Sequence, residues 1–181
     1  MLVISFDPGV TTGICYTIPE TGTYTTTTSD KAGLDPISLV WGILEQLDYL
    51  RVDLDIHKLL IVMEDAVVSG RMNSDKVEQI KVIARIEAVA DYLLKVSKEN
   101  HNDEVKFDVV FRKISPEMRK HIEVKLPEKF KTPHEKDAFL QAIAGAVLEG
   151  VTHIKGKEIK DAEFIRTDQQ KGRPDEISAE V

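Results

Sequence analysis

Three acidic side chains and one histidine stand where a metal-dependent site can form. Asp7 ends an apolar run and precedes a Pro-Gly turn, and Glu64 ends a second apolar run. His134 and Asp137 are three residues apart, so in a helix they share one face. Mg²⁺ prefers hard oxygen ligands and is usually held by a few carboxylates. If the strand ends converge, these residues form a candidate Mg²⁺ or Mn²⁺ site.

Such a site would hydrolyse phosphodiesters. Two ions about 3.5 to 4 Å apart can activate a water and stabilise the leaving oxygen. We therefore predict Asp7, Glu64, His134 and Asp137 as catalytic, metal-binding residues, with His134 as an extra ligand or a proton-handling group. Each of these residues could instead have a purely structural role, as a turn residue, as a polar residue where a strand reaches solvent, or as a charge that interacts with the helix dipole. The joint pattern is more specific than its parts.

The strands that would position these residues follow from the hydrophobic pattern. Residues 1–29 are typical of three antiparallel strands, because β-branched and apolar runs alternate with turn residues. Residues 59–63 are apolar on both faces, as in a central strand covered by helices. Residues 107–111 are a fifth candidate. The pattern predicts an α/β fold with a mixed sheet of about five strands, flanked by crossover helices.

Four helices are expected around this sheet. They begin at Asp35-Pro36, span 75–100, open at Ser115-Pro116 and span 137–149. The last is the best defined, because Thr132 and Glu135 have the spacing of a capping box. The apolar stripe of the first, which includes Trp41, is expected to face the core. The long helix has two apolar seams, and we predict that one of them is a homodimer contact, formed by Val82, Ile86, Val89, Leu93 and Val96.

Composition limits the class of protein. The 181 residues fit one domain over 1–150, followed by a polar tail over 151–181 that we expect to be peripheral or partly disordered. No apolar run approaches the roughly 18 residues of a membrane span. The single cysteine, Cys15, cannot form an internal disulfide, and the first residues lack the features of a signal peptide. We therefore expect a cytoplasmic protein outside the membrane.

The net charge of −7 argues against a nucleic-acid partner, but the charges are unevenly distributed. Residues 112–136 hold eight basic and four acidic side chains. This stretch is either a solvated surface or a region that binds phosphates. The candidate DNA contacts within it are Arg112, Lys113, Arg119, Lys120 and Lys136.

Five segments of the chain resemble motifs of one family, the RuvC-type Holliday junction resolvases of the RNase H-like superfamily. They are Phe6–Gly13, Ile61–Glu64, Gly70–Asn73 with the helix after it, Ser115–Lys120 and His134–Ala138. The first two look like the family's first two catalytic strands, and the third like its DNA-contacting loop. The fourth resembles a Ser-Pro-x-x-x-Lys segment, and the last resembles the final acidic helix motif. The resemblance covers roughly residues 1–149.

The resemblance implies an RNase H-like fold and a structure-specific endodeoxyribonuclease. Such an enzyme cuts four-way DNA junctions as a homodimer and leaves 5′-phosphate ends. By position, Asp7, Glu64 and Asp137 would hold two Mg²⁺ ions per site, and Mn²⁺ would substitute. His134 stands where many members have Asp. Arg71 in the loop, together with Asn73, and Lys120 would contact the DNA backbone, a contact that positions the substrate without reading sequence.

The chain departs from the family at three points. The stretch between Lys120 and His134 is shorter than in the bacterial enzymes of the family. The loop after Glu64 carries no aromatic side chain that could separate DNA strands by stacking on a base, and the tail from residue 151 has no recognisable counterpart. These departures indicate a divergent member, for example a phage-encoded one, with a looser preference among branched DNAs.

Three other functions stay open at this point. One is a nuclease of the same fold that acts more broadly on branched DNA. Another is a non-catalytic RNase H-like module that binds nucleic acid, which the intact acidic positions disfavour. The third arises because the segment from Asp7 to Gly13 is also similar to the phosphate-binding hairpin of the actin, Hsp70 and sugar-kinase group. Those proteins need two such domains, which 181 residues do not provide.

Overall fold

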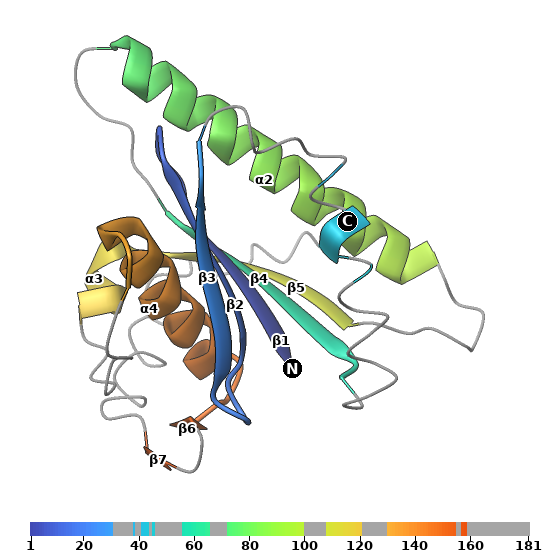
Figure 1. Cartoon of the computed structure of the whole chain (residues 1–181). Coiled ribbons are helices and arrows are strands. Elements are labelled where there is room, and N and C mark those ends of the chain that lie inside the picture. Colours follow the sequence, from blue (N-terminus) through green and yellow to red (C-terminus); the bar gives the residue numbers. More distant parts are fainter. Residues whose placement is uncertain are drawn as a thin grey trace, which may run out of the picture.

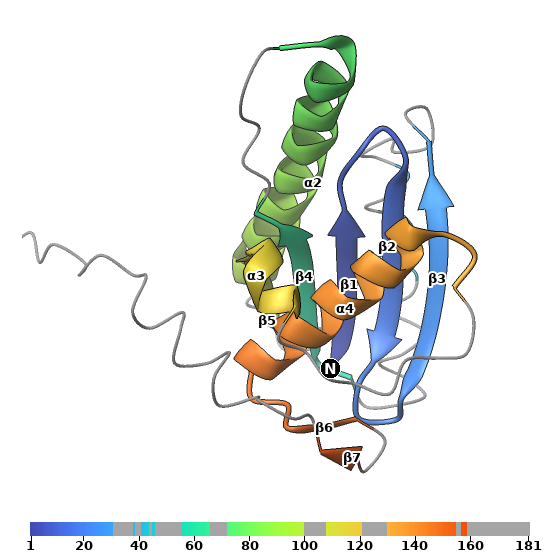
Figure 2. The same cartoon turned by 90° about the vertical axis from the view of Figure 1, so that its left-hand side faces the viewer.

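The structure, a computed structural model, describes residues 1–30, 38, 41–43, 45, 56–65, 72–99, 108–120, 130–154 and 157–158. Its centre is a five-stranded sheet in the order β3-β2-β1-β4-β5. The strands are β1 (Leu2–Asp7), β2 (Thr12–Ile18), β3 (Thr23–Ser29), β4 (Lys58–Glu64) and β5 (Asp108–Ile114). β1, β2 and β3 form an antiparallel meander, whereas β4 runs parallel to β1 and to β5 (Figure 2). The predicted α/β architecture, a mixed sheet of about five strands flanked by helices, is confirmed.

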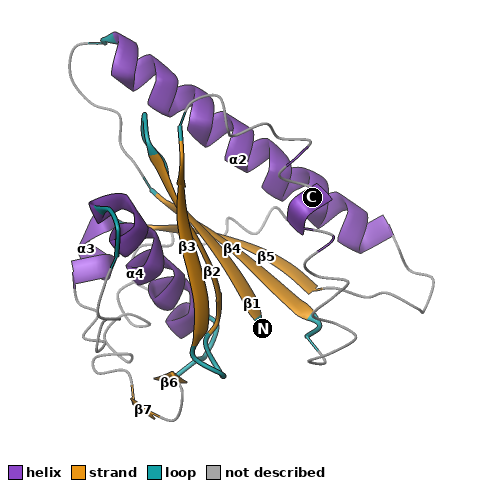
Figure 3. Cartoon of the chain, viewed as in Figure 1, coloured by secondary structure: helices purple, strands orange, loops and turns teal. Residues whose placement is uncertain are grey.

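Helices cover both faces of this sheet (Figures 1 and 3). The long helix α2 (Ser74–Glu99) lies on one face, and α3 (Pro116–Lys120) and α4 (Pro133–Leu148) lie on the other. After α4, the two-residue strands β6 (His153–Ile154) and β7 (Lys157–Glu158) pair with each other. The proposed division of the chain at residue 150 stays a prediction. None of the helices in the described part of the chain is both long and apolar enough to cross a membrane.

The alternation of side chains along the central strands builds two cores. In β1, Leu2, Ile4 and Phe6 are buried against α2, whereas Val3 belongs to the core beneath α4. β4 divides in the same way between the two cores, as expected for a strand covered on both sides. The face on which each carboxylate lies is therefore fixed by its place in this alternation.

The helix seam predicted as a dimer contact faces the chain's own sheet. Val82, Ile86, Val89 and Leu93 are at most 2% exposed and belong to the core on the α2 side, while Val96 is half-buried. The four buried side chains cannot meet a second chain, so that prediction is wrong for them. The reason is that both apolar seams of α2 have helical periodicity, which does not say which seam faces the sheet. The large apolar side chains that α2 exposes are Val77, Ile80 and Tyr92.

The helix expected from Asp35 is described at residues 38, 41–43 and 45, which are helical. Ile43 is fully buried in the core on the α2 side, but Trp41 is 68% exposed. The prediction that Trp41 faces the core is therefore wrong. Ile43 follows it by two residues, and positions two apart in a helix do not share a face.

Helix α4 lies unusually close to the sheet because Gly145 faces β4. A Cβ atom at this position would come within 2.4 Å of Val62 Cγ2, closer than side chains pack. Most residues of α4 between Ala138 and Val147 are buried, so the helix is covered by the sheet along its length. This close seating brings the first turn of α4 to the ends of the central strands.

Candidate active site

Strand alternation places two of the predicted carboxylates on the α4 face of the sheet. Asp7 follows Val3 and Ser5 in the odd-numbered set of β1, and Glu64 follows Leu60 and Val62 in β4. The parallel register pairs Phe6 with Met63, so the two acids end neighbouring strands side by side. Both lie at the carboxyl ends of their strands, which is the edge where ligands bind in open α/β sheets.

The first turn of α4 brings the other two predicted residues to the same edge. Thr132 caps the helix, because its Oγ1 accepts a hydrogen bond from the Glu135 backbone N–H at 3.1 Å. Glu135 is buried and its Oε2 accepts from the Lys131 backbone N–H at 2.8 Å. The predicted cap is confirmed, and it fixes the turn that carries His134 and Asp137.

Gly13 of β2 allows this turn to approach the sheet. A Cβ at Gly13 would stand 2.0 Å from the carbonyl oxygen of His134 and 2.5 Å from its carbonyl carbon. Both are backbone atoms, so neither can rotate away. Ser5 adds a contact from β1, since its hydroxyl donates to the Ala138 carbonyl. The glycine of the first motif therefore serves the site by making room for α4.

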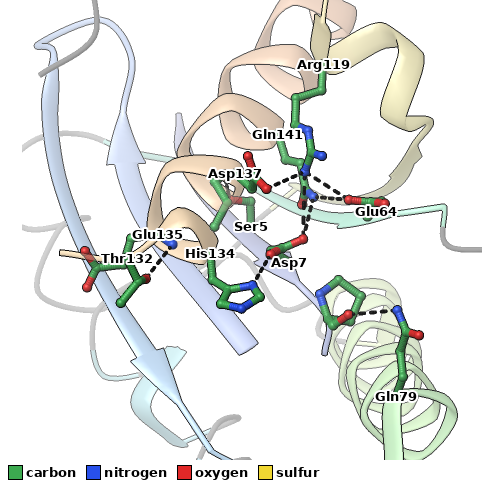
Figure 4. Close-up of polar contacts among 12 residues, drawn as sticks. Ser5, Asp7, Glu64, Gln79, Arg119, Thr132, His134, Glu135, Asp137 and Gln141 are labelled. Carbon is green, nitrogen blue, oxygen red and sulfur yellow. Dashed lines mark hydrogen bonds and ion pairs between the residues drawn. The ribbon is translucent and has the colours of Figure 1, made fainter. Parts of the chain in front are cut away.

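The three carboxylates converge on one atom of Arg119, which comes from α3 (Figure 4). Arg119 Nη1 lies 3.0 Å from Glu64 Oε2, 3.5 Å from Asp137 Oδ2 and 3.8 Å from Asp7 Oδ1. The Arg119 side chain is 18% exposed. The structure thus brings together acids from β1, β4 and α4 around a single cationic centre.

Two further side chains complete the cluster. His134 Nδ1 lies 2.8 Å from Asp7 Oδ2. Gln141, 1% exposed and one turn after Asp137, donates from Nε2 to Glu64 Oε2 at 3.0 Å and to Asp7 Oδ1 at 3.5 Å. Its Oε1 is buried without a hydrogen-bond partner. Buried polar atoms are nearly always paired, so this oxygen is an acceptor that the cluster leaves unused.

Crowding of negative charge affects the ionisation of the cluster. Burial raises the pKa of the Glu64 carboxyl, Arg119 lowers it, and the charges of Asp7 and Asp137 raise it further, with a raised pKa as the net result. Burial likewise raises the pKa of the Asp137 carboxyl against the opposing effect of Arg119. Three carboxylates face one guanidinium, so when all three are ionised the cluster holds excess negative charge, which favours a further cation.

The donor set fits a hard divalent cation in its chemistry. Carboxylates from three elements and an unpaired amide oxygen are the ligand types that Mg²⁺ and Mn²⁺ prefer. Among the described residues, no three His, Cys, Asp or Glu side chains are arranged to hold one metal ion. Arg119 Nη1 lies within 4 Å of all three carboxylates, at the position where they converge. The types of these side chains therefore fit a divalent metal ion, whereas their arrangement in this structure fits the Arg119 guanidinium.

These residues line an open cleft of about 410 Å³ between α2, α3 and the start of α4. Asn73, which stands directly before α2, and Lys76 of α2 line the same cleft. Gln79 joins α2 to the turn after β1, because its Nε2 donates to the Pro8 carbonyl at 3.1 Å (Figure 4). The cleft is open to solvent, and the three carboxylates of the cluster line it.

Those predicted DNA-binding residues whose side chains the structure describes do not form one surface. Arg112 pairs with Glu149 at 2.7 Å, at the far end of α4 from the acidic cluster, and Lys113 pairs with Glu87 of α2 at 2.5 Å. Arg119 points into the acidic cluster, where its Nη1 lies 3.0 Å from Glu64 Oε2, and its role as a DNA contact stays a prediction. The strand alternation of β5 explains the split, since neighbouring residues point to opposite faces. Asn73 and Lys136 are exposed.

The remaining two predicted contacts fall outside what the structure describes. Arg71 precedes the first described residue before α2, and the side chain of Lys120 is likewise outside the described atoms. Both stay predictions.

Sequence reasoning missed Gln141 and the part played by Arg119 in the cluster. Gln141 had a signal, because it is the only polar residue in the apolar run from Ala138 to Leu148 and follows Asp137 by four. A buried polar side chain on the acidic face of a helix points to a polar cluster. Arg119 had no such signal in the sequence, because only the position of α3 against α4 turns its side chain inward.

Comparison with known proteins adds two solved structures. No protein-family model and no curated protein matches the chain. The chain is similar to Thermus thermophilus RuvC in complex with a Holliday junction substrate, with a TM-score of 0.47 and 12% identity over 88% of this chain and 99% of that one. It is also similar to a second Thermus thermophilus RuvC structure, with a TM-score of 0.46 and 13% identity over 82% of this chain and 95% of that one.

Proposed function

We propose that this chain is a metal-dependent endodeoxyribonuclease that resolves four-way DNA junctions by paired phosphodiester hydrolysis and leaves 5′-phosphate ends. One observation carries the proposal. Carboxylates from β1, β4 and α4 converge within 3.0 to 3.8 Å of one cationic atom at the carboxyl edge of the sheet. The motif resemblance of the segments around Asp7, Glu64, Lys120 and Asp137 gives the reaction and the substrate class.

The chain's own residues have distinct tasks in this proposal. Asp7, Glu64 and Asp137 would hold the divalent ions, two per site, and Mn²⁺ would be able to replace Mg²⁺. His134 contacts Asp7 at 2.8 Å, so it acts as a further ligand or handles a proton beside that carboxylate. The ions, when bound, supply Lewis-acid stabilisation of the charge that develops at the phosphate.

The DNA backbone is expected to enter by the cleft beside α2. Asn73 and Lys76 line this cleft, and Lys136 is exposed next to Asp137. Arg71 and Lys120 remain proposed phosphate contacts on the strength of the motif resemblance. Phosphate contacts fix the position of the duplex without reading its sequence, which suits an enzyme that recognises branching.

We also propose that the enzyme works as a homodimer in the cytoplasm, because two opposed strands of a junction must be cut. The contact cannot use the buried seam of α2. The exposed side chains Val77, Ile80 and Tyr92 offer an outer face of the same helix. Sedimentation at micromolar concentration tests this, with a doubled mass expected and a lower mass for Ile80→Glu. A monomer at these concentrations would contradict it.

A panel of labelled substrates tests the proposed activity. An immobile four-way junction, a three-way junction, a flap and a linear duplex are incubated with the protein in Mg²⁺, in Mn²⁺ and in EDTA. Symmetric paired nicks in the four-way junction alone, absent in EDTA, are expected. Equal nicking of all branched forms would instead identify a broader branched-DNA nuclease, and tight binding without cleavage would identify a non-catalytic module.

A further inference from the structure

Arg119 occupies a position that an ordinary surface arginine does not. Its Nη1 is within 4 Å of three carboxylates from three different elements, and the side chain is 18% exposed. A divalent ion that used the same three carboxylates would stand close to this guanidinium, and like charges at such a distance repel strongly in a half-buried site. The guanidinium and the ion therefore cannot both remain at this point.

The anchoring of α3 allows the guanidinium to move while the helix stays. Met118 is 4% exposed in the core beneath α4, and its backbone N–H donates to Ser115 Oγ at 3.3 Å. These contacts hold the short helix by the residue that precedes Arg119. The arginine itself reaches the cluster through a long aliphatic stem with several rotatable bonds, so its head group can change position while the helix backbone stays.

The state of Gln141 supports the same reading. With Arg119 in place, the amide of Gln141 gives its Nε2 to Asp7 and Glu64, while its buried Oε1 has no partner. Arg119 and Gln141 together thus donate hydrogen bonds to Glu64 and Asp7, and Arg119 also forms an ion pair with Asp137, while one buried acceptor stays unused. This arrangement is expected when N–H donors occupy the place of a metal ion, because a metal ion could also bind the Gln141 oxygen.

We propose that Arg119 is a tethered cation that holds the three carboxylates together in the metal-free protein and is displaced from them when a divalent ion binds. This inference rests on the proposed metal-dependent function and adds to it a competitor inside the chain. The displaced guanidinium stays at the wall of the cleft, where the phosphate of a bound nucleic acid is its natural alternative partner. Metal binding and phosphate binding are then coupled through one side chain.

Metal affinity of the full-length protein tests the proposal without any cleavage assay. Free Mn²⁺ is measured by electron paramagnetic resonance during titration of wild type, Arg119→Gln and Arg119→Lys. Removal of the competitor is expected to tighten Mn²⁺ binding by about tenfold or more, equivalent to about 1.4 kcal/mol. Arg119→Lys, which keeps a cation but not the planar fork, is expected to lie between the two.

Thermal unfolding separates this role from a merely structural one. In EDTA, Arg119→Gln is expected to unfold at a lower temperature than wild type, because three carboxylates lose their counter-charge, and Mg²⁺ is expected to stabilise it more than wild type. Arg112→Gln is the matched control, because it breaks an arginine–carboxylate pair at the other end of α4. This control should lower the unfolding temperature equally with and without Mg²⁺ and leave Mn²⁺ affinity unchanged.

The outcomes distinguish this inference from the proposed function. Mn²⁺ binding that is equally tight in wild type and Arg119→Gln, or weaker in the variant, would overturn the tethered-cation role while leaving a metal-dependent nuclease intact. Failure of all variants, including wild type, to bind Mn²⁺ at millimolar concentration would overturn both.

Discussion

Substitution of Gly13 by alanine is expected to disturb the acidic site from β2, a strand that carries none of its carboxylates. The added Cβ would stand 2.0 Å from the His134 carbonyl oxygen, whereas ordinary contacts begin at 3.4 Å. The start of α4 must therefore move by more than an ångström. That displacement moves His134 Nδ1 away from Asp7 Oδ2, from which it lies 2.8 Å. It also moves Asp137, which belongs to the same turn of α4.

The expected size of this effect follows from the contact. Overpacking of this kind costs about 1 to 3 kcal/mol, and each kcal/mol lowers Tm by about 2 to 4 °C in a chain of this size. Misplacement of catalytic groups by about 1 Å can lower the rate about 100-fold. Gly13→Ala should therefore lose far more cleavage than stability, when both are measured at a temperature where the variant is folded.

Gly42→Ala is the matched control for this experiment. Gly42 is exposed and helical, and a Cβ there would meet nothing within 4 Å. Alanine should stabilise that helix by about 0.5 to 1 kcal/mol and leave cleavage unchanged. Thermal unfolding and cleavage of a labelled junction measure both variants. Wild-type Tm and wild-type cleavage in Gly13→Ala would refute the close seating of α4 on β2.

Three further predictions follow from the packing around this site. Lys58 and Arg112 hydrogen-bond Glu149 and, against the effect of its burial, lower its pKa below the ordinary 4.5. Glu149→Gln should therefore cost about 1 to 2 kcal/mol at pH 7, at the low end for such bonds because both partners are about one-third exposed. The difference in unfolding free energy between Glu149→Gln and wild type should shrink as the pH falls below 4.5, where the carboxylate of the folded protein takes up a proton. Denaturation at a series of pH values would measure this difference, and a difference that stays constant would contradict the ion pairs. Gly145→Ala should destabilise by about 1 to 3 kcal/mol through its clash with Val62, and Val62→Ala should recover part of this loss; additive effects of the two substitutions would argue against the contact. Cys15 is buried, and its burial raises the pKa of the thiol to about 12, so it should resist a thiol reagent at pH 8 until urea unfolds the chain; rapid labelling of the native protein would contradict its place in the core beneath α4.

The sheet could be predicted from sequence because local signals agreed with the global fold. Val3 and Ile4 belong to a run that is apolar on both faces, which requires cover on both sides. Turn residues mark the ends of the strands, and Thr132 with Glu135 marks the start of α4. Asp7 and Glu64 stand at strand ends for the same reason, and the strand order places them side by side.

The surfaces could not be predicted in the same way, because several placements satisfy one pattern. Both seams of α2 have helical spacing, and the seam with Ile86 faces the sheet. Arg112, Lys113 and Arg119 form a basic stretch in sequence, yet they end at three separate places, each with its own carboxylate partners. Which acid a long basic side chain meets depends on tertiary packing, and composition carries no information about it.

The most direct test of the proposed catalytic cluster compares wild type with Asp7→Asn on one labelled four-way junction in Mg²⁺, with cleavage and binding measured in parallel. Asp7 contacts His134, Gln141 and Arg119. The asparagine amide has nearly the shape of the aspartate side chain, so the substitution removes the proposed metal-binding carboxylate and leaves the basic surface residues unchanged. Asp7→Asn is expected to lose paired cleavage and to bind the junction as tightly as wild type. Cleavage by Asp7→Asn at the wild-type rate would contradict the assignment of the acidic cluster as the catalytic site.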